Sequence, residues 1–177
     1  HLVLGVLEGE YLGIRFGSEV RKAIPEAMTL LASDKEEDRI LLLAASLTLE
    51  DLRFALFVAE RAAADESRSV RVRAAGALGD LVNYLPDEDR VRTLLLSLLD
   101  DPDAGVRALA CRRAFECRLD AVFPWAVDHL QDMGEARIHW RGEADTVRPG
   151  LEALRGLQAL TGIREEVDYL DYRLLSA

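Results

Sequence analysis

The side chains that most often bind metals or act as nucleophiles are few in this chain, and their spacing matches no site of that kind. The histidines are His1, His129 and His139, and none stands in the His-Glu pair that a helical metal site would use. Cys111 and Cys117 are six residues apart on one predicted helix, so their side chains point to different faces. The sequence also lacks a phosphate-binding loop, a dinucleotide fingerprint and a nucleophile elbow. We therefore expect no catalytic residue, no metal site and no cofactor.

Arginine is the residue type with the most regular spacing. Three of the valine–arginine dyads recur at similar spacings, a weaker Asp38-Arg39 copy precedes them, and the four arginines are 32, 36 and 41 residues apart. Small residues follow the first two dyads three to four positions later. Periods of this length are typical of architectures in which helix pairs stack on one another. These three dyads are Val70-Arg71, Val106-Arg107 and Val147-Arg148.

These arginines could serve chemistry or structure, and the repetition favours structure. Each stands near the start of a predicted helix, and aspartates stand in turns such as Asp100-Asp101-Pro102-Asp103. Guanidinium and carboxylate groups form strong paired hydrogen bonds, and a pair at every turn would explain why the arginine recurs. We expect a structural ladder formed by Asp65, Arg71, Asp101, Asp103, Arg107 and Arg148.

Apolar residues at helical spacing surround the arginines, so helices must position these side chains. Val70, Ala74, Ala77, Leu78 and Leu81 fall on one helix face, and nothing in the chain alternates convincingly with a period of two. Segments of helical period also precede each dyad, and proline and aspartate end one helix and cap the next. The predicted fold class is all-α. The preceding segments are Glu26–Ala32, Leu52–Ala64, Val91–Leu99 and Ala121–Leu130.

We expect one helical-repeat domain over residues 1–177, with ends that differ from the middle. Residues 18–162 hold the repeats, and the N-terminal segment 1–17 shows no repeat pattern. In residues 163–177, apolar residues at helical spacing predict a terminal capping helix with one polar face. Residues 131–144 contain two glycines and no clear period, so an irregular loop is expected there.

The two central copies resemble the HEAT-repeat family, in particular its short bacterial, PBS-lyase-type form. The resemblance is strongest over residues 65–118, weaker over 26–64 and 119–161, and absent over 1–17. The segments that carry it are Ser69-Val70-Arg71 leading into Ala74, Ala77, Leu78 and Gly79, and Asp101-Pro102-Asp103 leading into Val106-Arg107 and Ala110.

The resemblance implies an α-α superhelix, or solenoid, of about four helical hairpins followed by the capping helix. In this family an aspartate–arginine ladder commonly joins adjacent repeats, and the second helix of each hairpin lines the concave face. Asp38 stands where the pattern has valine, and Arg113 stands where Ala77 aligns, so we expect Arg113 to be displaced to the surface. The second helices would cover roughly residues 38–48, 68–82, 104–117 and 145–161.

The overall charge argues against a nucleic-acid binder. The chain has 22 basic and 32 acidic residues and a formal net charge of −10, and no part of it is basic. No apolar run reaches the ~18 residues that a membrane-spanning helix needs. The apolar stretch Leu2–Leu7 is too short for the core of a signal peptide. We expect a cytoplasmic protein that binds neither nucleic acid nor a membrane.

The leading functional hypothesis is a non-catalytic HEAT-like repeat module that binds a protein partner through its concave face. Stacked hairpins present a long rigid groove, and no catalytic constellation is visible. The alternative is a chromophore lyase-type subunit or carrier, which would need a sizeable apolar pocket in the groove. Nucleic-acid binding is the weakest candidate. The candidate contact residues are Arg73, Asp80, Arg112 and Glu116, with Trp140 at the rim.

Overall fold

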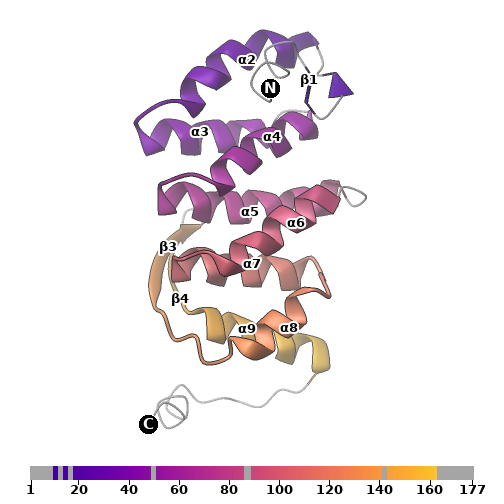
Figure 1. Ribbon diagram of the computed structural model, residues 1–177, viewed down its shortest axis with the longest axis vertical. Coiled ribbons are helices and arrows are strands. Elements are labelled where there is room, and N and C mark those ends of the chain that lie inside the picture. Colours follow the sequence, from indigo (N-terminus) through magenta and orange to yellow (C-terminus); the bar gives the residue numbers. More distant parts are fainter. Residues whose placement is uncertain are drawn as a thin grey trace.

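Helices form most of the structure, a computed structural model that describes residues 10–11, 14–15, 18–48, 51–85, 89–140 and 143–162. Within these residues there are eight α-helices, one short 3-10 helix and two pairs of short strands (Figure 1). The prediction of a mostly helical protein is confirmed. The helices are α2 (Ser18–Leu31), α3 (Glu36–Ser46), α4 (Leu52–Ala63), α5 (Arg68–Tyr84), α6 (Asp89–Ser97), η1 (Leu98–Asp100), α7 (Ala104–Glu116), α8 (Val122–Asp128) and α9 (Pro149–Thr161).

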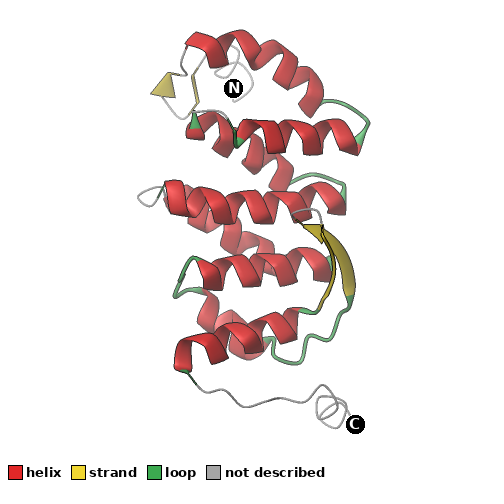
Figure 2. Cartoon of the chain, turned by 180° about the vertical axis from the view of Figure 1, so that it is seen from behind, coloured by secondary structure: helices red, strands yellow, loops and turns green. Residues whose placement is uncertain are grey.

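The helices follow one another in chain order along the long axis of the molecule and form two layers (Figures 1 and 2). One layer contains α2, α4, α6 and α8. The other, which we call the second-helix layer, contains α3, α5, α7 and α9. Within it α3 contacts α5, α5 contacts α7, and α7 contacts α9. Each of these helices also contacts the helix before it, so that α2/α3, α4/α5, α6/α7 and α8/α9 form pairs.

Buried apolar residues form a core between the two layers, from Ile24 on α2 to Ala153 on α9. The predicted apolar face of α5 is buried, since Val70, Ala74 and Leu81 are all inaccessible to solvent. Other sides of α5 are buried as well, because α3, α4, α6 and α7 all contact this helix. The alanines and glycines of α5 allow these neighbours to approach closely, as dense packing requires.

Polar residues in the turns fix the starts of three helices. The Asp51 carboxylate accepts hydrogen bonds from backbone N–H groups in the first turn of α4, and the Ser67 hydroxyl does so for α5. Asp103 plays the same role for α7. Each cap satisfies N–H groups that have no partner inside the helix. The aspartates and serines of the turns therefore set where the elements begin.

The prediction of an irregular loop over residues 131–144 is wrong, because a β-hairpin occupies much of this segment. β3 (Ala136–Trp140) pairs antiparallel with β4 (Glu143–Val147). Figure 2 shows the hairpin along one edge of the stacked helices. The last second helix is accordingly shorter than the expected residues 145–161, since α9 begins at Pro149.

The hairpin forms because one of its faces packs on α5 and α7. Ala136 and Ile138 are buried whereas Arg137 and His139 are exposed, which is the alternation of a strand with one face on a core. Gly105 at the start of α7 makes room for it, since a Cβ there would lie 2.8 Å from Ile138 Cγ2. This alternation is too short to signal a strand in a sequence dominated by helical periods.

Arg113 is buried, so the expectation that it is displaced to the surface is wrong. The residue is 5% exposed, and its guanidinium forms ion pairs with Asp80 and Glu116. A Cβ on Gly79 of α5 would overlap the Arg113 side chain, so this glycine makes the space that the arginine occupies. Two carboxylates balance the buried charge, which would otherwise be costly.

The two ends of the chain are described only in part. β1 (Glu10–Tyr11) and β2 (Ile14–Arg15) pair antiparallel ahead of α2. The capping helix predicted for residues 163–177 lies outside the described residues. No helix in the described part of the chain has the length and apolar character needed to cross a lipid bilayer.

A substitution on α9 tests the contact between the last two helices of the second-helix layer. Gly156 faces the ring of Phe115 on α7, and a Cβ at this position would overlap that ring. Replacing glycine by alanine in a helix ordinarily stabilises it by up to about 1 kcal/mol. Here we expect Gly156→Ala to lower the free energy of unfolding by about 1–3 kcal/mol, because the ring must move. Urea denaturation measures this change.

The matched control is Ala159→Ser, which also adds one heavy atom but at an exposed position of the same helix. Its free energy of unfolding should stay within about 0.5 kcal/mol of the parent. If Gly156→Ala were instead more stable than the parent, α7 and α9 could not be in the contact described.

Candidate functional site

Three arginines of the second-helix layer each bind an aspartate in the turn of the next helix pair. Each arginine lies in the first half of α3, α5 or α7, and each aspartate lies between the two helices of the following pair. We call these three ion pairs the ladder. The Nε–Oδ2 distances are 2.8 Å for Arg39–Asp65, 2.7 Å for Arg71–Asp101 and 2.9 Å for Arg107–Asp132.

The remaining polar atoms of each ladder pair hold the turns themselves. Arg71 Nη1 donates to the carbonyl oxygen of Asp65 (2.9 Å), and Arg107 Nη1 donates to that of Asp101 (2.8 Å). The second carboxylate oxygen of Asp101 accepts the backbone N–H of Asp103 at 2.8 Å. A ladder arginine therefore joins the turn of its own helix pair to the turn of the next pair.

Burial makes these ion pairs sensitive to the loss of either partner. The side chains of Arg71 and Asp101 are 15% and 6% exposed. The hydrogen bond with Asp101 raises the pKa of Arg71, and the hydrogen bond with Asp65 raises the pKa of Arg39. The arginines are thus held in the charged form. Removing one partner would leave the other charge poorly solvated and unpaired.

Two residues expected in the ladder are placed elsewhere. Asp103 caps α7, and its nearest arginine is Arg68, with 3.4 Å between Nε and Oδ2, instead of Arg107. Arg148 directly precedes α9 and pairs with Glu135, and both of these side chains are partly exposed. Arg148 thus closes the hairpin segment onto itself and does not join two helix pairs.

Two ladder residues, Arg39 and Asp132, were absent from the predicted set. The other ladder turns share a spacing of six residues, from Asp65 to Arg71 and again from Asp101 to Arg107, but neither missed residue has an oppositely charged residue at that spacing. Arg39 has Ser33 at that spacing, and its Nη1 donates to the Ser33 carbonyl. Asp132 begins a similar turn but has Ile138 of β3 six residues later, so that the ladder ends there.

Two of the predicted contact residues meet at a cavity between α3 and α5. Arg73 and Asp80 of α5 line this space of about 220 Å³. The rest of the lining is apolar and comes mainly from α3, including Ile40 and Leu47. Asp80 is also bound to Arg113, so its carboxylate is held in place at one end of the cavity.

The other two line a cavity of about 460 Å³ between α7 and α9, where Arg112 and Glu116 lie with Phe115. Arg112 is already engaged, since its Nε donates to Glu152 Oε2 at 3.0 Å and its Nη2 to Asp145 Oδ2 at 2.9 Å. These hydrogen bonds, first that of Glu152, raise the pKa of Arg112. Arg112 therefore attaches the hairpin and α9 to α7.

Trp140 is the fifth predicted contact residue. It is the last residue of β3, and its side chain lies outside the described part of the structure. The structure therefore brings four of the five candidates to cavities of the second-helix layer, in two separate groups. Of these four, Asp80, Arg112 and Glu116 form ion pairs within the chain.

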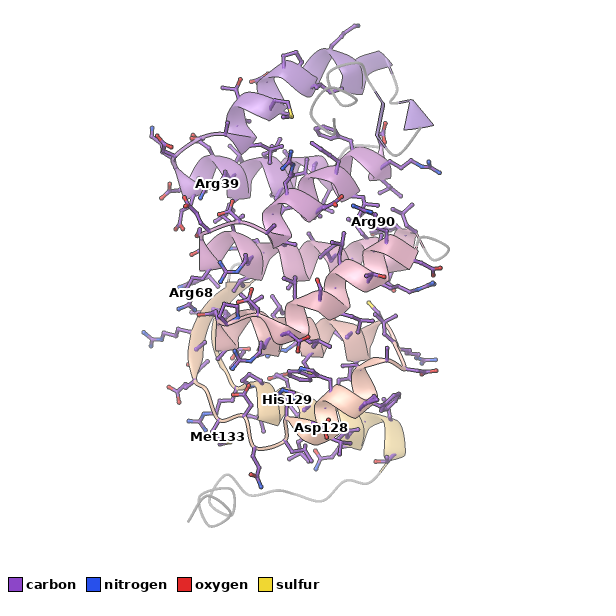
Figure 3. The ribbon with its side chains drawn as sticks, viewed as in Figure 1. Arg39, Arg68, Arg90, Asp128, His129 and Met133 are labelled. Atoms are coloured by element: carbon purple, nitrogen blue, oxygen red, sulfur yellow. The ribbon has the colours of Figure 1, made fainter. Side chains whose placement is uncertain are left out.

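The cysteines and His129 occupy structural positions. Burial raises the pKa of the Cys111 thiol to about 12, and burial also raises that of Cys117. His129 lies at the end of α8 (Figure 3), and its ring stacks on the Trp125 ring with 4.2 Å between ring centroids. Among the described residues, no group of three or more His, Cys, Asp or Glu side chains could hold a metal ion.

Comparisons with known proteins assign no family to the chain. No family model, no curated protein and no solved structure matches it. The functional argument therefore rests on the geometry described above.

Truncation of two arginines tests whether the ladder contributes as much to the stability of the protein as its burial implies. Arg107→Ala should lower the free energy of unfolding by about 2–3 kcal/mol, because Asp132 is left without its partner in a largely buried site. Arg148→Ala removes the same side chain from the more exposed pair with Glu135 and should cost less than about 1 kcal/mol. Thermal and urea denaturation of both variants measure the difference. Equal losses in the two variants would contradict a special role for the ladder.

Proposed function

We propose that the chain is an α-α superhelix of four HEAT-like helical hairpins that binds a protein partner in the cytoplasm and performs no catalysis. The paired helices, their order and the arginine–aspartate ladder are all what the HEAT-like resemblance implies. In such an array the second helices form the concave face. The proposal places the partner on α3, α5, α7 and α9.

The observation that carries the proposal is that three cavities lie on the second-helix layer, while a further one, of about 330 Å³, lies beside α2, α4 and the turn before α5. Of the three, one lies between α3 and α5, one between α3, α5 and β3, and one between α7 and α9, with volumes of about 220, 390 and 460 Å³. Cavities in series along one face provide pockets for successive side chains of a partner, whereas an enzyme concentrates its chemistry in one pocket. A row of pockets therefore favours recognition of a protein segment.

The chemistry of this face also favours binding over catalysis. Its carboxylates and guanidinium groups are paired with one another, as in Arg112–Glu152 and Arg113–Asp80, which positions them as fixed charges. The buried Cys111 thiol, with its pKa raised to about 12, is unsuited to act as a nucleophile near neutral pH.

A second candidate is the chromophore lyase-type subunit or carrier, and the cavity between α7 and α9 favours it. Phe115 and Leu160 supply apolar lining, and the exposed Arg118 supplies a cation that could pair with a carboxylate of a tetrapyrrole. A change in the absorbance spectrum of biliverdin on addition of the protein would support this candidate. Nucleic-acid binding stays the weakest alternative because the net charge is −10.

Affinity capture with two matched variants of α3 tests the protein-binding proposal. Ala44 is exposed and lines the cavity between α3 and α5, so Ala44→Arg would fill that cavity. The neighbouring Ala45 is equally exposed and lies outside the lining of this cavity, so Ala45→Arg is the control. We expect proteins captured from host lysate by the parent chain to be lost with Ala44→Arg and retained with Ala45→Arg. Retention of the same proteins by both variants would refute the proposed face.

A further inference from the structure

We infer that the partner segment bound across α3 and α5 is acidic at the end near β3 and apolar at the other end. This inference rests on the proposed function and adds the chemistry of the partner. It follows from two adjoining cavities whose linings differ in charge.

The first cavity is bordered by α3, α5 and β3 and is lined by an excess of basic groups. Arg68 and Arg73 come from α5, Arg137 and His139 come from β3, and the carboxylate in the lining is that of Glu36. Figure 3 shows Arg68, the first residue of α5, beside the hairpin. In a chain with a net charge of −10, this is a local reversal of sign. We call this space, of about 390 Å³, the basic cavity.

Charge remains in the basic cavity after the known pairings are counted. Arg68 Nε lies 3.4 Å from Asp103 Oδ2, and its Nη2 donates to the backbone carbonyl of Arg137 at 2.8 Å. Asp103 pairs with Arg68, and even if Glu36, the carboxylate of the lining, balances the charge of Arg73, the guanidinium of Arg137 is left. This side chain is exposed, and within the described part of the chain it forms no ion pair. An anionic group of a partner would complete the balance.

The second cavity continues the groove with a mostly apolar lining. It is the space of about 220 Å³ between α3 and α5, and Ile40 and Arg73 line both cavities. The remaining lining residues are the apolar Leu43, Ala44, Leu47 and Ala77, with Asp80. We call this space the apolar cavity. A partner that reaches both cavities must therefore combine a charged group with apolar side chains.

The length and polarity of the partner segment follow from α5. Arg68 and Asp80 are twelve residues apart, which at ~1.5 Å per residue is about 18 Å of helix. An extended peptide of about five or six residues, at ~3.3 Å each, spans this distance. Asp80 stands at the far end of the apolar cavity, and its cluster with Arg113 and Glu116 has two carboxylates for one guanidinium, so a second acidic group of the partner would be disfavoured there. The polarity of the segment is thus fixed, with acidic residues at β3 and apolar residues over Leu43 and Leu47.

Peptide selection on the purified full chain tests this inference. A phage-displayed library of random twelve-residue peptides should yield sequences in which two or three Asp or Glu residues lie next to a run of apolar residues. For a selected peptide carrying a fluorescent label, Arg137→Glu should weaken binding at least about tenfold in an anisotropy titration. The same peptide with Lys in place of its acidic residues should then bind Arg137→Glu more tightly than it binds the parent.

The control is Arg53→Glu on α4, an exposed arginine outside the lining of both cavities, which should leave the affinity within about twofold. Selected peptides without acidic residues, or binding unaffected by Arg137→Glu, would overturn the inference. If peptide binding were unaffected by Arg137→Glu but abolished by Ala44→Arg, the proposed binding face would be supported, and the proposed acidic character of the partner would be wrong. A selection that yields no binding peptide would also overturn the inference. The affinity capture with Ala44→Arg and Ala45→Arg would still test the proposed function independently.

Discussion

The ladder is the interaction on which the arrangement of the helices depends. A helix pair with an apolar face can be buried in many ways, because hydrophobic contact is not directional. A guanidinium that donates Nε to the next turn and Nη1 to its own turn accepts only one relative placement, as Arg71 shows between Asp101 and Asp65. The apolar core supplies the stabilisation, and the ladder selects the register in which neighbouring pairs meet.

Because these ion pairs lie at the turns, the rest of each second helix can pack closely on its neighbour or border a cavity. Between α5 and α7 the space above Gly79 is filled by Arg113, whereas between α3 and α5 the same layer is hollowed into cavities. In the last helix pair the position six residues after Asp132 is Ile138, which packs the hairpin on the core. The hairpin both ends the ladder and brings Arg137 to the basic cavity.

The helices could be predicted from the sequence because their signals are local. The spacing of Val70, Ala74 and Leu81 and the capping residues between helices placed α4 to α8 within a few residues, whereas α2 begins at Ser18, well before the predicted Glu26. What the sequence did not reveal depends on partners far along the chain. Arg113 is buried because Gly79 on another helix yields space, and β3 forms because Gly105 admits Ile138. Asp132 escaped notice since no arginine follows it at the spacing of the other turns. The cavities depend on how the side chains of different helices pack against one another, and this cannot be predicted from any single segment of the sequence.

A double-mutant cycle at Arg71 and Asp101 tests the central claim most directly. The parent, Arg71→Ala, Asp101→Ala and the double variant are unfolded in urea, and the four free energies give the coupling between the two side chains. Their burial and bidentate geometry predict a coupling of about 1–3 kcal/mol. A coupling below about 0.5 kcal/mol would mean that the two side chains act independently. The ladder would then be a consequence of the stacking and could not select its register.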